Sequence, residues 1–132
     1  MNDAHGSFEA QPALRSWFIA HFLVDMLFAI PLMIAPKEFL GIVGMENVDP
    51  VLARLVAAAL FAIGIQSWIG RNEGREAYTA MLNLKIIWAS SAVVGMLWGL
   101  SEGAPTIVWG FVGIFGAFLV VWIHFRKLLQ RS

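Results

Sequence analysis

Four long apolar stretches, separated by shorter polar segments, dominate the hydrophobic pattern of the chain. They cover residues 16–35, 51–70, 79–100 and 105–125. A hydrocarbon core of about 30 Å is crossed by roughly 20 helical residues, so each stretch is long enough to span a membrane. The strict alternation of a barrel strand is missing, and barrel strands are about half as long. The pattern therefore predicts an all-α integral membrane protein, with one four-span domain over residues 1–132.

The polar connections predict that these helices form an antiparallel four-helix bundle. Asp49 followed by Pro50 is typical of a helix start. The turns at 71–76 and 101–105 are short, so they join antiparallel neighbours. Residues 36–49 form the one long connection. Its proline start and apolar side predict a short helix at the membrane surface, with a hydrophobic loop as the alternative.

The positive charges near the span ends predict the orientation of the chain. The side shared by the two termini and the second loop carries Arg15, Arg71, Arg75, Arg126, Lys127 and Arg131. The first and third loops carry Lys37 alone. Because Lys and Arg are concentrated in cytoplasmic segments, both termini are expected to be cytoplasmic.

Composition narrows the function classes. The chain is 59% hydrophobic and 14% charged, which excludes a soluble globular protein. Nine basic residues balance nine acidic ones, so no net field attracts nucleic acid. The absence of cysteine excludes disulfides and thiolate metal sites. No nucleotide, zinc-protease or nucleophile motif is present, so neither catalytic residues nor a cofactor is expected.

Small residues at helical spacing predict close contacts between helices. The third span has Ser91, Gly95 and Gly99, the second has Ala58 and Ala62 with Gly64 nearby, and the fourth has Gly110, Gly113, Gly116 and Ala117. In lipid such faces let backbones approach one another. Packing within one bundle is the favoured interpretation. Packing in a homo-oligomer or against the helices of a larger complex is the alternative.

Polar residues inside the spans provide the candidate ligand-binding site. They are His21, Asp25, Gln66, Asn83 and Lys85, with Trp88 one turn beyond Lys85. At about 1.5 Å per residue, Asp25 lies roughly 13 Å inside the first span, close to the membrane midplane. Ionisable groups at that depth are costly and usually have a partner or a function. We therefore expect a water-filled pocket that opens toward the cytoplasm, with Asp25 as its floor and Lys85 as its counter-charge.

Structural roles compete with the pocket at each of these positions. Asp25 can simply fasten helices together by bonding Asn83 or Gln66, and Lys85 can extend its ammonium to the inner headgroups. Trp88 is more simply explained as core packing than as a ligand-stacking residue. Asn83 and Lys85 are about 200° apart around a helix, so only one of them can face the pocket.

A stretch in the first loop resembles a known group of proteins. Residues 35–44, read as APKEFLGIVG and followed by Asp49-Pro50 and Arg54, are similar to the pattern of small bacterial four-span inner-membrane proteins. The resemblance covers about residues 25–70. It implies a bacterial inner-membrane location and transfers no activity or catalytic residue.

Three functions are compatible with these observations. The favoured one is a non-catalytic accessory or assembly subunit that docks onto itself or a larger membrane complex. A transporter is less favoured, because a single polar layer without a counterpart in the outer half of the membrane is poorly suited to alternating access. The second is a small-molecule, ion or proton carrier that works through Asp25. The third is a haem- or quinone-binding subunit, suggested by His21 and His124 on two different spans.

Overall fold

The computed structural model describes residues 12–132, and that part of the chain is helical apart from short connections. Its elements in chain order are α1 Pro12–Ile34, α2 Pro36–Ile42, α3 Pro50–Ile69, the 3-10 turn η1 Gly70–Asn72, α4 Arg75–Ser101 and α5 Val108–Arg131. The four long helices, one of them extended by η1, are each long and apolar enough to cross a membrane. The predicted number of long apolar helices is confirmed.

Capping residues and turns determine where the helices begin and end, and these positions differ from the ends of the apolar stretches. The Asp49 carboxylate accepts hydrogen bonds from the backbone amides of Val51 and Leu52, at 2.7 and 3.3 Å, which confirms the predicted start of α3. α5 begins at Val108, three residues later than expected, because a turn with Gly103 at a φ of +98° precedes it. It then continues to Arg131, since backbone hydrogen bonding does not stop where the apolar stretch does.

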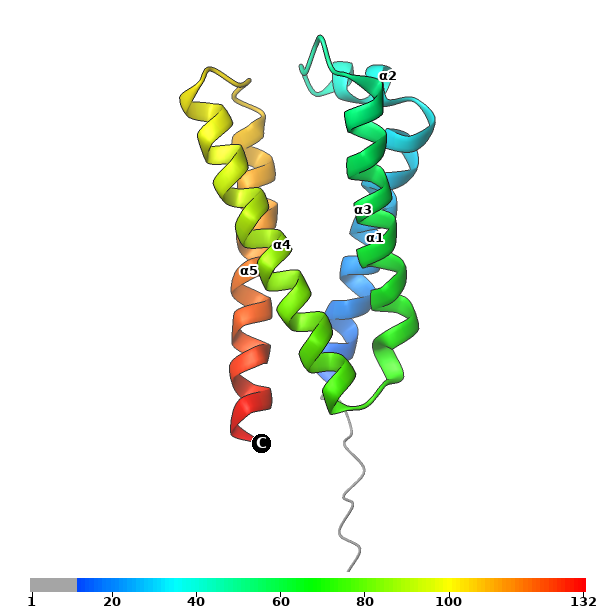
Figure 1. Cartoon of the computed structure of the whole chain (residues 1–132), viewed down its shortest axis with the longest axis vertical. Helices are drawn as coiled ribbons and strands as arrows, with labels where there is room; N and C mark the ends of the chain where they lie inside the picture. Colours follow the sequence, from blue (N-terminus) through cyan, green and yellow to red (C-terminus); the bar gives the residue numbers. More distant parts are fainter. Residues whose placement is uncertain (1–11) are drawn as a thin grey trace, which may run out of the picture.

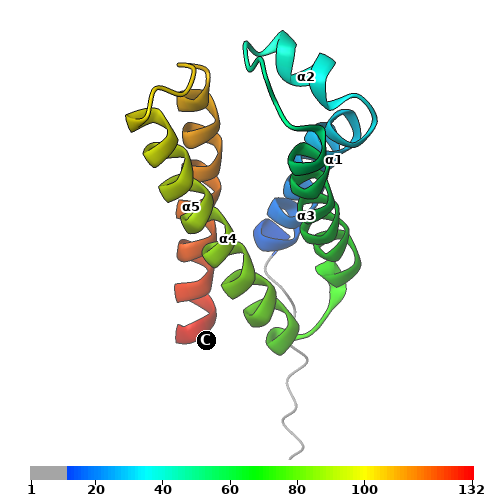
Figure 2. The ribbon, with the colours of Figure 1, turned by 45° about the horizontal axis from the view of Figure 1, so that its top comes forward.

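The long helices form two antiparallel pairs, α1 with α3 and α4 with α5 (Figure 1). The pairs approach each other near the start of α1 and the end of α5, and they diverge toward the end that carries α2. A second view shows the same divergence (Figure 2). Packing of all the long helices in one bundle is therefore limited to one end of the molecule. This differs from the uniform bundle that the short loops predict.

Residue size explains why the pairs meet at one end only. There the junction cluster holds bulky side chains from α1, α4 and α5, namely Leu14, Phe18, Tyr78, Met81, Leu82, Trp122, Phe125 and Leu129. Toward the other end, Gly95 on α4 and Gly110 and Gly113 on α5 would have open space around an added Cβ. Small residues there do not reach across to the other pair.

The α1–α3 pair has its own core at the end that carries α2. This α1–α3 cluster consists of Ala29, Leu32, Ala53, Ala57 and Leu60. The small residues that α3 buries are Ala53, Ala57, Gly64 and Ser67. Of the small residues expected from the sequence, Gly64 is buried, whereas Ala58 and Ala62 are exposed. The four-residue spacing of alanines was predicted correctly, but the buried pair lies earlier in α3 than expected. The sequence does not indicate the buried face, because apolar residues surround α3 on all sides.

The first connection contains a helix, as predicted. α2 begins at Pro36, where a proline is favoured because its missing N–H would have no partner anyway. Its side chains Phe39 and Leu40 pack against the α1–α3 cluster. Gly44, at a φ of +79°, then redirects the chain toward α3.

Candidate functional site

Two ionisable residues of α1, His21 and Asp25, occupy core positions. The buried residues of α1 follow a spacing of three and four, and they are Leu14, Phe18, His21, Asp25, Ala29 and Leu32. His21 and Asp25 therefore belong to the same stripe that holds α1 against its neighbours. Only 6% of His21 and 4% of Asp25 is exposed.

Lys85 of α4 meets this stripe and joins the two helix pairs. Its ammonium donates a hydrogen bond to His21 Nδ1 on α1, at 2.8 Å, and another to Ser67 Oγ on α3, at 2.6 Å. The rings of Phe18 and Trp122 lie 5.0 Å from Nζ, within the range of a cation–π interaction. Lys85 is 2% exposed, so the expectation that it extends toward the headgroups is wrong.

Asp25 accepts no such hydrogen bond. Its Oδ2 lies 3.1 Å from His21 Nδ1. An imidazole nitrogen carries at most one proton, and a nitrogen that accepts from Lys85 has none to donate. Among the buried side-chain nitrogen and oxygen atoms of residues 12–132, Asp25 Oδ2 is the one without a hydrogen-bond partner. An unpaired buried acceptor costs about 1–3 kcal/mol, which is a reason to look for a ligand at this position.

Gly64 lets α3 approach Asp25. A Cβ added at Gly64 would lie 2.7 Å from Asp25 Cβ and 3.1 Å from Asp25 Oδ2. Only glycine therefore fits at this crossing of α1 and α3. The backbone of α3 in this way helps to bury the carboxylate.

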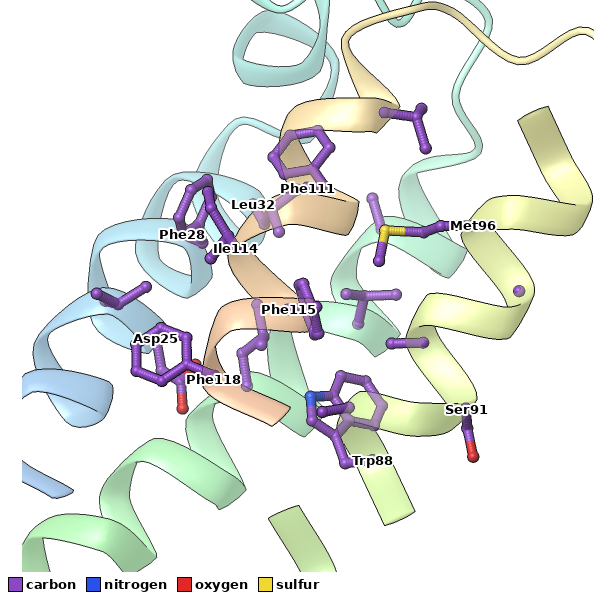
Figure 3. Close-up of a pocket in the computed structure, with 18 of the residues that line it drawn as sticks. Asp25, Phe28, Leu32, Trp88, Ser91, Met96, Phe111, Ile114, Phe115 and Phe118 are labelled. Carbon is purple, nitrogen blue, oxygen red and sulfur yellow. The ribbon is translucent and has the colours of Figure 1, made fainter. Parts of the chain in front are cut away.

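An apolar cavity of about 640 Å³ lies between the two helix pairs, on the α2 side of the polar network. Figure 3 shows side chains of several helices pointing into it, including Phe28, Phe111 and Phe115. The ionisable residues in its lining are His21, Asp25 and Lys85. These three form the polar floor of a cavity that is otherwise mostly apolar.

In the described part of the chain, four of the five exposed residues in the cavity lining lie on α3 and α4, which indicates that the main opening lies between these two helices. The four are Leu52 and Val56 on α3 and Ser91 and Gly95 on α4. The α1–α5 side is narrowed by an edge-to-face contact of Phe28 with Phe111, whose ring centroids are 6.0 Å apart.

This geometry differs from the expected water-filled pocket open toward the cytoplasm. The junction cluster fills the end of the molecule where α1 begins and α5 ends, and Trp122 stacks there on Phe118 at 5.6 Å. Bulky aromatic residues close that end, and small residues leave the other end open. Asp25 lies at the floor of a cavity, as expected. The cavity, however, extends from Asp25 toward the end that carries α2, and not toward the junction cluster.

The structure brings together four of the six predicted site residues. His21, Asp25, Lys85 and Trp88 line the cavity, and Trp88 packs on Phe115 at a centroid distance of 6.3 Å. Gln66 is exposed, and its amide lies 3.9 Å from Met81 Sδ. Asn83 accepts a hydrogen bond of 2.8 Å from Arg126 Nε. Neither amide bonds Asp25, in contrast to the expected helix-fastening contact.

The other polar residues singled out from the sequence lie elsewhere. His124 is exposed and packs on Phe125, whereas His21 is buried beside Lys85, so the two histidines occupy different surroundings. Arg54 donates to the backbone carbonyl of Met33 at 3.1 Å and so satisfies a carbonyl at the end of α1. Within residues 12–132 no three His, Asp or Glu side chains gather as a metal site.

Sequence reasoning missed Ser67 and the aromatic lining. Ser67 continues a buried stripe of α3 that runs Ala53, Ala57, Leu60, Gly64, Ser67. That spacing of three and four was readable, but Gln66 next to it drew attention as the larger polar group. The phenylalanines that line the cavity could not be recognised from the sequence, because phenylalanine is equally common on helix faces that contact lipid.

No protein-family model, curated protein or solved structure gives a significant match to this chain.

Proposed function

We propose that this chain is a multi-pass membrane protein that binds a lipophilic small molecule in the cavity between its two helix pairs. The supporting observation is an apolar cavity of about 640 Å³ whose floor is polar. Pockets for small molecules typically measure about 300–1,000 Å³ and combine apolar walls with a few polar groups. The aromatic walls and the His21–Asp25–Lys85 floor fit that description.

Packing physics supports an occupant for this cavity. Protein interiors are close-packed, and a space that could hold roughly twenty waters at about 30 Å³ each is far larger than an ordinary packing defect. Water gains little from apolar walls, so a molecule drawn from the bilayer fills this space better. The opening between α3 and α4 faces in the direction from which such a molecule would come.

The orientation predicted from the positive charges would place the cavity in one half of the bilayer. In a bacterial inner membrane with both termini cytoplasmic, the cavity would lie in the half of the bilayer remote from the cytoplasm, and α2 would lie at that surface. The junction cluster would separate the cavity from the cytoplasm. We therefore propose binding, for storage, sensing or presentation, in preference to transport across the membrane.

Two glycines provide a matched test of this proposal. Gly95 lines the cavity and Gly113 does not, and an added Cβ meets no atom within 4 Å at either position. Gly95→Leu should fill part of the cavity and lower the saturable labelling of the protein by a photoreactive alkyl diazirine in nanodiscs about tenfold, as expected for overpacking by 1–3 kcal/mol. Gly113→Leu should label like the unmodified protein. Equal labelling of all three proteins would contradict the proposal.

An accessory or assembly role is the second candidate function. The observation that favours it is the outward row of Gly110, Gly113 and Gly116 on α5, around which the chain leaves open space. Such a row lets a second helix approach closely. In this case Gly113→Leu would reduce the mass of the complex extracted in mild detergent and Gly95→Leu would not. The same two variants therefore distinguish the two functions.

A further inference from the structure

The floor of the cavity lies deep in the membrane. Asp25 is nine residues before Ile34, where α1 ends, which is about 13–14 Å along the helix at 1.5 Å per residue. That distance is nearly half of a hydrocarbon core about 30 Å thick. A phospholipid with its headgroup at the α2 surface would therefore bring only the ends of its acyl chains to the floor. Hydrocarbon at that position leaves Asp25 Oδ2 without a partner.

The floor carries no net charge. Lys85 as an ammonium, Asp25 as a carboxylate and a neutral His21 sum to zero. These three are the ionisable residues that line the cavity. Burying an additional unpaired charge against this floor would carry a large desolvation cost. The polar group of an occupant is therefore expected to be uncharged.

The floor of the cavity has an acceptor without a donor, whereas its donor has acceptors. Lys85 donates to both His21 and Ser67, so this donor has acceptors. Within residues 12–132 the Asp25 carboxylate accepts no hydrogen bond. The group that would complete the floor is thus a donor, and a hydroxyl is the smallest uncharged donor that a lipophilic molecule commonly carries.

We propose that the ligand is an uncharged lipophilic alcohol that enters with its hydroxyl group toward the membrane midplane and donates a hydrogen bond to the Asp25 carboxylate. This inference rests on the proposed binding function and specifies its ligand class. The aromatic residues around the cavity surround the hydrocarbon part of the molecule. Asp25 lines the cavity, so its carboxylate is the acceptor that the hydroxyl meets there, beside the one buried side-chain atom of residues 12–132 without a hydrogen-bond partner.

The test is a competition experiment with the full chain in nanodiscs. A photoreactive, alkyne-bearing analogue of cetyl alcohol labels the protein, and cetyl alcohol, hexadecane or hexadecylamine competes at equal mole fraction in the bilayer. Cetyl alcohol should compete about tenfold better than the other two, because a hydrogen bond to a charged group contributes about 1.5–3 kcal/mol. In Asp25→Leu, which removes the acceptor, the advantage of the alcohol over hexadecane should disappear.

Each other outcome has a definite meaning. Equal competition by hexadecane would overturn the alcohol proposal and leave the binding function in place. Stronger competition by hexadecylamine would overturn it in favour of a cationic ligand. An absence of saturable labelling by the analogue, together with unchanged labelling of Gly95→Leu by the alkyl diazirine, would remove the binding function itself. The comparison of competitors on the unmodified protein does not require Asp25→Leu to fold.

Discussion

Replacement of Lys85 by methionine is expected to lower the free energy of unfolding by about 3–5 kcal/mol, the usual effect of removing one partner from a buried ionic network. Lys85 is 2% exposed, and its ammonium is the group that joins α4 to His21 on α1 and Ser67 on α3. Without it, the buried Asp25 carboxylate has no nearby cation. Thermal or denaturant unfolding in detergent micelles measures the effect.

Two further variants test whether the loss of stability in Lys85→Met comes from the buried ionic network. Arg126→Met removes a cation from a partly exposed hydrogen bond with Asn83, and it should cost less than about 1 kcal/mol. Adding Asp25→Leu to Lys85→Met should recover much of the lost stability, because no uncompensated charge then remains buried. A loss in Lys85→Met no larger than that in Arg126→Met would show that Lys85 does not hold the pairs together.

Substitution of Gly64 by alanine is the second large effect expected. The new Cβ would lie 2.7 Å from Asp25 Cβ and 3.0 Å from Met26 Cε. Asp25 Cβ is fixed to the backbone of α1, so the helices must move apart, at a cost of about 1–3 kcal/mol. The movement would also widen the floor of the cavity. Equilibrium unfolding together with diazirine labelling reports both consequences.

Other glycines provide the matched controls for this substitution. Gly95→Ala meets nothing within 4 Å, so it should be neutral or stabilising by up to about 1 kcal/mol through the better helix propensity of alanine. The added Cβ of Gly70→Ala meets the flexible end of Met81, so the stability of this variant should fall between those of Gly64→Ala and Gly95→Ala. If Gly64→Ala is as stable as Gly95→Ala, the close approach of α1 and α3 at Asp25 is not present.

The hydrophobic pattern was sufficient to predict the four long apolar helices, because a helix that crosses a bilayer needs about 20 apolar residues. Turn chemistry likewise predicted the cap at Asp49. The pattern could not predict how the helices pair. In lipid both the buried and the lipid-facing sides of a helix are apolar, so Ala57 and Ala58 look alike in the sequence although only Ala57 is buried.

The polar network was partly predictable for the same physical reason. Ionisable residues within a span are costly, so His21, Asp25 and Lys85 stood out against their apolar surroundings. Their mutual arrangement depends on how α4 meets α1, which no local pattern encodes. The side on which the cavity opens depends on the distribution of bulky and small residues over three helices. That distribution becomes meaningful only when the junction cluster is known.

Occupancy of the cavity is tested most directly by a photoreactive amino acid placed in the chain itself. Benzoylphenylalanine at Phe115 lies in the cavity lining, and at Trp109, which is 58% exposed and outside that lining, it faces the surroundings. After irradiation in native membranes, intact mass spectrometry should show one adduct of defined mass at position 115 and a broad mixture of phospholipid adducts at position 109. The same phospholipid mixture at both positions would mean that the cavity is filled by bulk lipid, and it would contradict the proposed binding function.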